Sequence, residues 1–179
     1  YLTAADSWTP KGSVRNSEQL LCESLAAWHA TKPDLPRVKR AAEQVLTKES
    51  NLPRAVRITA RFLRAQAGRE QGAAPAAVLS EFADLADWMC GEVDLTAADA
   101  LNMYDAIIKP TLDWAAKLKL DDAAKESLAR LYNIQGGLLF KFSDANWSGR
   151  FDKPADAEVT AFSRAFELDP SRASYVAFR

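Results

Sequence analysis

This chain of 179 residues contains few of the side chains that most often build metal and catalytic sites. It has one histidine, His29, and two cysteines, Cys22 and Cys90, which lie far apart in the sequence. Zinc sites in proteins draw on clusters of Cys and His at short spacing, and two isolated cysteines do not make a disulfide framework. We therefore expect no metal site, no cofactor and two buried free thiols.

Catalytic signatures are missing as well. The sequence contains no nucleophile elbow, no phosphate-binding glycine loop and no zinc-binding histidine motif. Glu81, Asp84 and Asp87 recur at helical intervals and lack the alternate spacing of a calcium loop, which indicates an outward-facing acidic surface. The sequence therefore predicts a protein that is not an enzyme. A pair of carboxylates that meets only in space would leave no such signature.

Long apolar runs are also absent. No stretch approaches the ~20 apolar residues that a membrane-spanning helix needs, and no signal peptide is visible. Because the chain starts at Tyr1 and stops at Arg179, just inside a predicted helix, we expect it to be a segment of a longer protein. The sequence leaves its compartment and its oligomeric state open.

Lysine and arginine are missing from the middle of the chain. The net charge is −1, yet residues 73–108 contain seven acidic residues and no basic one. Residues 1–72 contain 12 basic and seven acidic residues. An asymmetry of this kind can steer a charged partner, or it can favour contacts between oppositely charged helices.

Helical patterning is what the sequence does contain. Alanine is frequent and β-branched residues are sparse, which favours helix over strand, and no alternating strand pattern appears. Apolar residues recur at helical spacing. We interpret residues 1–15 as an irregular lead-in and residues 16–179 as one all-α domain. Its helices are expected near 17–31, 36–48, 53–68, 76–90, 97–110, 111–118, 121–142 and 156–168, with a kink or an end at Pro110.

The most specific pattern lies in the last third of the chain. One buried face of an amphipathic helix is predicted to consist of Val159, Phe162, Ala165, Phe166 and Leu168. The helix before it contains Gly136 and Gly137, each of which costs a helix interior roughly 1 kcal/mol relative to alanine. We expect a neighbouring helix to approach closely at these glycines; the alternative is a helix break.

This part of the chain resembles the tetratricopeptide repeat family. The resemblance is carried by an aromatic residue and a glycine in one helix and by three residues at the family's spacing in the next: Tyr132, Gly136, Phe162, Ala165 and Pro170. Two features depart from the pattern, because Glu158 replaces a small residue and because extra residues lengthen the loop within 143–154. The resemblance implies antiparallel helix pairs stacked as an array; a compact irregular helical bundle is the alternative.

The same resemblance implies a scaffold that binds a protein or a peptide without catalysis. One candidate surface for a partner is a row of arginines at i, i+3, i+7 and i+10, here named the arginine strip: Arg54, Arg57, Arg61 and Arg64. Such a row can bind an acidic peptide, a phosphate group or nucleic acid, although the lack of interleaved aromatic residues disfavours nucleic acid. Alternatively, it is a solvated face or is paired with the acidic residues 73–108.

The second candidate surface is the loop that contains Trp147, Arg150 and Phe151. Loops with an insertion and aromatic residues often contact partners; alternatively, this loop folds back so that Trp147 and Phe151 cover the core. The expected function is thus a scaffold for a protein or peptide. The alternatives are a polyanion or nucleic-acid binder that uses the arginine strip, and an accessory domain of a helical enzyme.

Overall fold

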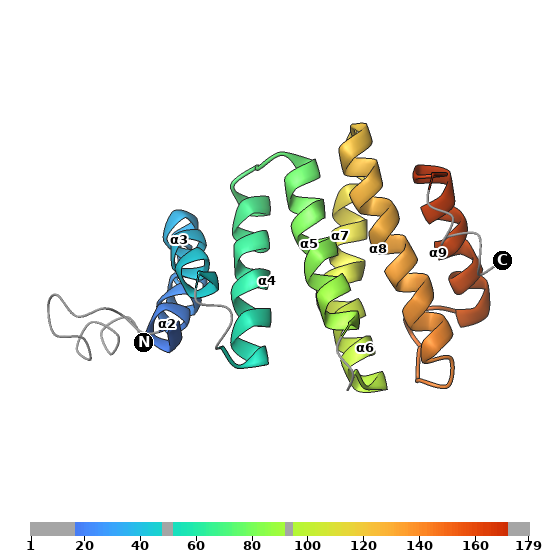
Figure 1. Ribbon diagram of the computed structural model, residues 1–179, viewed down its shortest axis with the longest axis horizontal. Coiled ribbons are helices and arrows are strands. Elements are labelled where there is room, and N and C mark those ends of the chain that lie inside the picture. The colour runs from blue at the N-terminus through green and yellow to red at the C-terminus, as the bar shows by residue number, and fades with distance from the viewer. Residues whose placement is uncertain (1–16, 48–51, 92–94, 172–179) are drawn as a thin grey trace, which may run out of the picture. The chain divides into compact units, whose positions relative to one another are not determined.

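The computed structural model describes residues 17–47, 52–91 and 95–171, and Figure 1 shows that they form helices joined by short connections. None of the residues in these ranges belongs to a strand, so the predicted all-α fold class is confirmed. The predicted lead-in at residues 1–15 lies outside the described residues. The chain divides into two compact units, Tyr1–Ala73 and Ala74–Arg179, whereas a single domain for residues 16–179 stays a prediction.

Unit 1 contains the helices α2 (Ser17–Trp28), α3 (Leu35–Leu46) and α4 (Arg54–Glu70), which all pack against one another. The Asp34 side chain accepts a hydrogen bond from the Arg37 backbone N–H at 3.2 Å and caps α3, as expected for an N-cap aspartate. The core consists mainly of small and branched apolar side chains: Leu20, Ala27, Val38, Ala42, Val45, Ala60, Leu63 and Ala67.

Unit 2 contains α5 (Pro75–Cys90), α6 (Ala97–Met103), the π-helical turn η2 (Tyr104–Ile108), α7 (Lys109–Ala115), α8 (Asp122–Lys141) and α9 (Pro154–Leu168). Helix α8 lies between α5 and α9 and packs against both (Figure 1). The largest fully buried side chains of this unit are Leu79, Phe82, Leu85, Met103, Ile108, Leu131, Leu139, Trp147 and Phe162. This core holds α8 and α9 in place, and these two helices carry the residues of greatest interest.

Two predicted helix starts in unit 2 are confirmed in atomic detail. The Thr96 hydroxyl accepts from the Asp99 N–H, and the Asp99 carboxylate accepts from the Thr96 N–H, which is a complete capping box. Asp121 accepts from the Ala124 N–H at 2.8 Å and starts α8. Both residues satisfy N–H groups that a helix terminus otherwise leaves unpaired.

Of the two outcomes predicted at Pro110, a kink or an end, the end is wrong. Helical structure continues from α6 through η2 into α7, and the backbone widens into a π turn just before the proline. The widening is the physical reason: a proline in a regular helix lacks an N–H and collides with the carbonyl of the preceding turn, and a wider turn gives its ring room. The Thr111 hydroxyl donates to the Ile107 carbonyl at 2.6 Å and satisfies one acceptor there.

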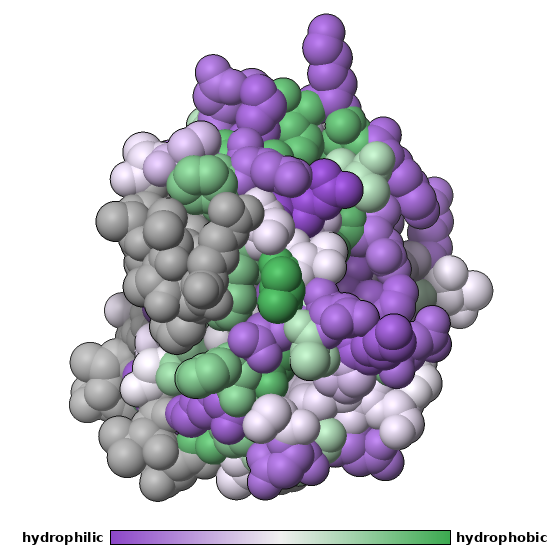
Figure 2. All heavy atoms as spheres, turned by 90° about the vertical axis from the view of Figure 1, so that its right-hand side faces the viewer, coloured by the Kyte–Doolittle hydropathy of each residue, from purple (hydrophilic) through white to green (hydrophobic). Residues whose placement is uncertain are grey.

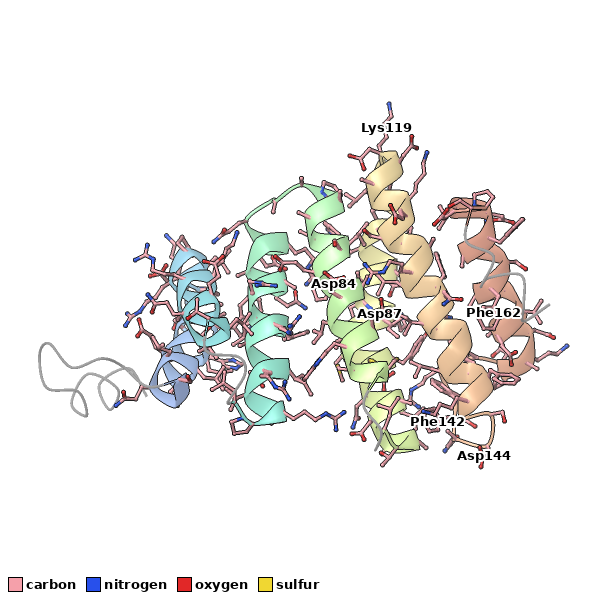
Figure 3. All side chains as sticks on the ribbon, viewed as in Figure 1. Asp84, Asp87, Lys119, Phe142, Asp144 and Phe162 are labelled. Carbon is pink, nitrogen blue, oxygen red and sulfur yellow. The ribbon has the colours of Figure 1, made fainter. Side chains whose placement is uncertain are left out.

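Helix α8 runs unbroken through both glycines, which excludes the predicted alternative of a helix break. A Cβ atom on Gly136 would lie 2.8 Å from two ring atoms of Phe162, so the expected close approach of α9 is confirmed at this residue. Figure 3 labels Phe162 on α9. At Gly137 the expectation is not met by the described residues, because a Cβ atom there would meet none of their heavy atoms within 4 Å. The burial predicted for Val159 is also wrong: its side chain is 60% exposed, since it lies at the edge of the face that Phe162 and Ala165 bury.

Candidate functional site

The α8–α9 hairpin brings together the residues on which the family resemblance rests. Gly136 receives the ring of Phe162, and Ala165 packs against Ala129, with Tyr132 beside them. Phe162 and Ala165 are almost fully buried, at 2% and 0% exposure. These small and aromatic residues therefore hold two antiparallel helices at close distance, which leaves the outer sides of α8 and α9 for other contacts.

The arginine strip lies on α4 in unit 1. All four of its arginines are half-buried. Arg61 and Arg64 line a shallow groove of about 350 Å³ together with Glu43 of α3 and Thr47, which directly follows α3. Arg57, Arg61 and Arg64 already have interaction partners within the structure. The strip is therefore partly engaged, and the Nε atom of Arg54 is one of several buried Nε atoms of the strip that have no hydrogen-bond partner within the described ranges.

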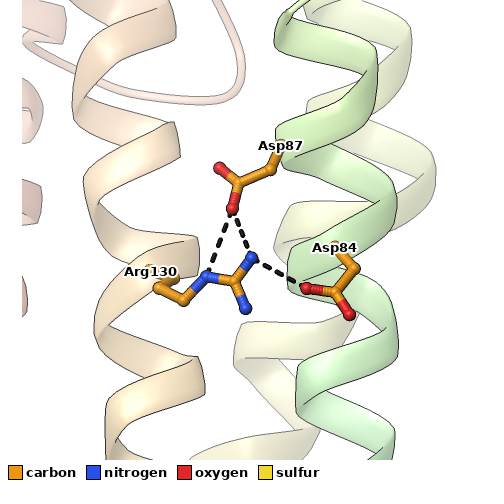
Figure 4. Close-up of polar contacts among 3 residues, drawn as sticks. All are labelled: Asp84, Asp87 and Arg130. Atoms are coloured by element: carbon orange, nitrogen blue, oxygen red, sulfur yellow. Dashed lines mark hydrogen bonds and ion pairs between the residues drawn. The ribbon is translucent and has the colours of Figure 1, made fainter.

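The acidic surface predicted around Asp84 and Asp87 is exposed, as expected, but it is also bridged. Arg130 of α8 donates from Nη2 to Asp84 at 2.8 Å and from Nε to Asp87 at 3.2 Å, and it makes a second, closer contact with Asp87 (Figure 4). Burial alone would lower the pKa of Arg130, but the hydrogen bonds that it donates to both carboxylates hold this pKa above its ordinary value. Arg130 thus fastens α8 to α5.

The loop between α8 and α9 folds back onto the helices of unit 2. The Trp147 side chain is only 1% exposed, and its Nε1 donates to the Phe142 carbonyl at 2.9 Å. Its ring meets the Tyr104 ring edge-on, at 5.8 Å between centroids. The structure therefore places Trp147 in the core instead of on the surface, in agreement with the predicted alternative in which the loop covers the core.

Arg150 and Phe151 complete this contact with η2. Arg150 donates from Nε and Nη2 to the two carboxylate oxygens of Asp105, at 2.9 and 2.5 Å, and Phe151 packs on Tyr104 at 5.0 Å. Burial, together with the nearby Asp113 and Asp105 carboxylates, raises the pKa of Tyr104 to about 12. The loop residues proposed from the sequence as partner contacts are thus occupied with contacts inside unit 2.

The two cysteines are free, but their predicted burial is wrong for one of them. Cys22 is exposed on α2, whereas Cys90 is half-buried at the end of α5. Burial, followed by the charge of Asp87, raises the pKa of Cys90 to about 11. A neutral thiol of this kind behaves as a small apolar group and reacts only slowly as a nucleophile.

A pocket in unit 2, here named the α8 pocket, was not anticipated from the sequence. It has a volume of about 280 Å³ and lies between Cys90 of α5, Leu95, Asn133, Ile134 and Gly137 of α8, and Phe162 of α9. Asn133 is one of the lining residues, and its Oδ1 atom is buried without a hydrogen-bond donor among the described residues. Gly137 was the one sequence feature that pointed to this pocket, because glycine destabilises a helix interior and its presence there needs an explanation. A single residue does not reveal which helices meet around it.

Within the described ranges, no group of three or more His, Cys, Asp or Glu side chains is arranged to hold a metal ion. None of the helices in those ranges is both long enough and apolar enough to cross a membrane. Comparison with known proteins gives no match to a protein-family model, to a curated protein or to a solved structure. The assignment of function therefore depends on the geometry of this chain.

Proposed function

We propose that this chain is a non-catalytic scaffold that binds a protein or a peptide on the outer sides of stacked helices. The observation that carries the proposal is the α8–α9 hairpin. Tyr132, Gly136, Phe162 and Ala165, which give the chain its resemblance to the tetratricopeptide repeat family, are also the residues at which the two helices meet. Agreement between sequence pattern and packing supports a repeat-like hairpin built for binding.

The surface of unit 2 supports the same function. Phe140 and Val159 expose 58% and 60% of their area to solvent, and the α8 pocket opens beside α8 and α9. Figure 2 views the molecule from the α9 side and shows green apolar side chains among purple polar ones. Apolar surface with a polar surround is typical of sites where proteins meet partners.

Selection of binders from a random peptide library on the purified full chain tests this function. The proposal expects selected peptides that bind the chain saturably, with affinities that change little as salt is added. Failure to select any peptide that binds saturably would contradict it. Affinity that falls steeply with salt, together with equal binding of heparin, would instead indicate a polyanion binder that uses the arginine strip.

A further inference from the structure

Gly137 is the glycine that the packing of the described residues does not explain. A side chain on Gly136 would collide with the Phe162 ring, whereas a Cβ atom on Gly137 meets no heavy atom within 4 Å. Glycine weakens the interior of a helix relative to alanine, so its presence at residue 137 calls for another reason. Since Gly137 lines the α8 pocket, its missing side chain leaves space in that pocket.

The size and the walls of the α8 pocket restrict what can occupy it. Its volume of about 280 Å³ is below the range of roughly 300–1,000 Å³ in which cofactors and drug-sized ligands bind. Four apolar residues, Leu95, Ile134, Leu138 and Phe162, form much of its lining. A pocket of this volume and character suits one large apolar side chain, the kind of anchor that dominates the binding energy of protein interfaces.

Two polar groups at the pocket indicate which chemical groups of a bound partner would lie next to such an anchor side chain. Asn133 Oδ1 is a buried acceptor without a donor among the described residues, and rotation of its amide would let it accept from the backbone N–H of a bound chain. Lys141 contributes a positive charge to the lining, and its ammonium group lies 5.3 Å from the centre of the Phe142 ring with no carboxylate partner among the described residues. Asp87 is paired with Arg130, which also binds Asp84. The part of the rim at Lys141 is therefore complementary to a negative charge.

We propose that the α8 pocket receives one large aliphatic or aromatic side chain of a bound protein segment, next to an acidic residue that meets Lys141. This inference rests on the proposed function, because it identifies where and by what chemistry the scaffold holds its partner. Asn133 accepts a backbone N–H next to the anchor, and Gly137 keeps the pocket open.

Binding of the library-selected peptides to pocket variants of the full chain tests the inference. Gly137→Leu places a side chain in the open space at residue 137 and fills the pocket, so it is expected to fold and to weaken peptide binding at least ~10-fold. The matched control, Ala123→Leu, adds the same side chain at an exposed position of the same helix and is expected to leave the affinity unchanged. Replacing the acidic residue of the peptide by glutamine is expected to weaken binding to the full chain but not to a Lys141→Ala variant.

Capture of small disulfides by Cys90 gives a test that needs no peptide. In a Cys22→Ser background, the full chain is equilibrated with a phenethyl disulfide or a hydroxyethyl disulfide, and the mixed disulfide is measured by intact mass. The inference expects several-fold greater capture of the phenethyl group, and Gly137→Leu is expected to remove this preference. Equal capture of the two groups would overturn the inference.

The outcomes separate the two proposals. If peptides bind and Gly137→Leu does not weaken them, the pocket is not the anchor site and the scaffold function stands. If no peptide binds saturably, the scaffold function itself fails and the inference about its anchor fails with it.

Discussion

Gly136 and Gly137 are neighbours in α8, but their surroundings differ at the level of single atoms. Phe162 fills the space where a side chain of residue 136 would lie, and it is 2% exposed, so its ring has little freedom to move away. At residue 137 no heavy atom of the residues that the structure describes lies within 4 Å of the corresponding position. The same substitution at the two positions should therefore have opposite effects on stability.

Gly136→Ala is expected to lower the free energy of unfolding by about 1–3 kcal/mol, because overpacking against Phe162 outweighs the gain in helix propensity. Gly137→Ala is expected to raise it by about 1 kcal/mol, because only propensity changes. Urea unfolding followed by circular dichroism measures both. Adding Phe162→Leu to Gly136→Ala should recover part of the loss, and equal effects of the two alanines would contradict the close contact.

The two cysteines are expected to differ in reactivity. Cys22 is exposed, whereas burial and Asp87 raise the pKa of Cys90 to about 11. Because the thiolate is the reactive form, Cys90 should react slowly with iodoacetamide near neutral pH, and its rate should rise about 10-fold per pH unit until the pH approaches that pKa. Intact mass spectrometry over time measures this, and modification of both thiols at one common rate would refute it.

At the scale of the helices, local sequence predicts those ends that depend on a single turn. Thr96 with Asp99 and Asp121 act on N–H groups within their own first turn, so their caps are readable from spacing alone. Pro110 is different, because its effect depends on whether the backbone before it can widen into η2. Tyr104 and Ile107 of that turn are buried, and no local pattern contains the tertiary contacts that bury them.

Thr111→Val tests how much the hydrogen bond beside Pro110 stabilises the continuous helical segment from α6 to α7. The Thr111 side chain is 1% exposed, and its hydroxyl donates to the Ile107 carbonyl. Valine has nearly the same shape but leaves that buried carbonyl without this donor, so the free energy of unfolding should fall by about 1–3 kcal/mol. Thr160→Val removes a similar hydrogen bond to Asp156 at an exposed position of α9 and should change stability by less than about 0.5 kcal/mol.

Trp147 is expected to be the main stabilising contact of the loop between α8 and α9. Its buried ring lies against Tyr104, and its Nε1 bonds to the Phe142 carbonyl. Trp147→Ala should lower the free energy of unfolding by about 3–5 kcal/mol, as measured by thermal or urea unfolding. Arg150→Ala removes an exposed ion pair and should cost much less; equal costs for the two variants would contradict this assignment.

At the scale of the whole molecule, the sequence predicts the helical class and the α8–α9 contact but not the long-range pairing of charges. Residues 73–108 contain no basic side chain, and three of their carboxylates pair with arginines from a later helix and a later loop. Asp84 and Asp87 meet Arg130, and Asp105 meets Arg150. The acidic segment is therefore partly neutralised inside unit 2. Counting charges along the sequence is compatible with such pairing but does not tell which arginine pairs with which carboxylate.

For the candidate site, too, one part could be predicted from the sequence and another part could not. Spacing alone places the arginine strip on one side of a helix, and the structure has α4 there. The α8 pocket depends on Cys90, Asn133 and Phe162, which belong to three different helices. Their meeting point is set by tertiary packing of α5, α8 and α9, so periodicity within any one of these helices carries no signal for it.

The most direct test of the account is nuclear magnetic resonance of the full chain as a selected peptide is added. If the proposed scaffold function and anchor pocket are correct, the largest chemical-shift changes occur at the methyl groups of Ile134 and Leu138 and at the side-chain amide of Asn133. Residues on α4 show only small chemical-shift changes. Shifts that centre on Arg57, Arg61 and Arg64 while the α8 pocket stays unchanged would contradict the account and move the site to the arginine strip.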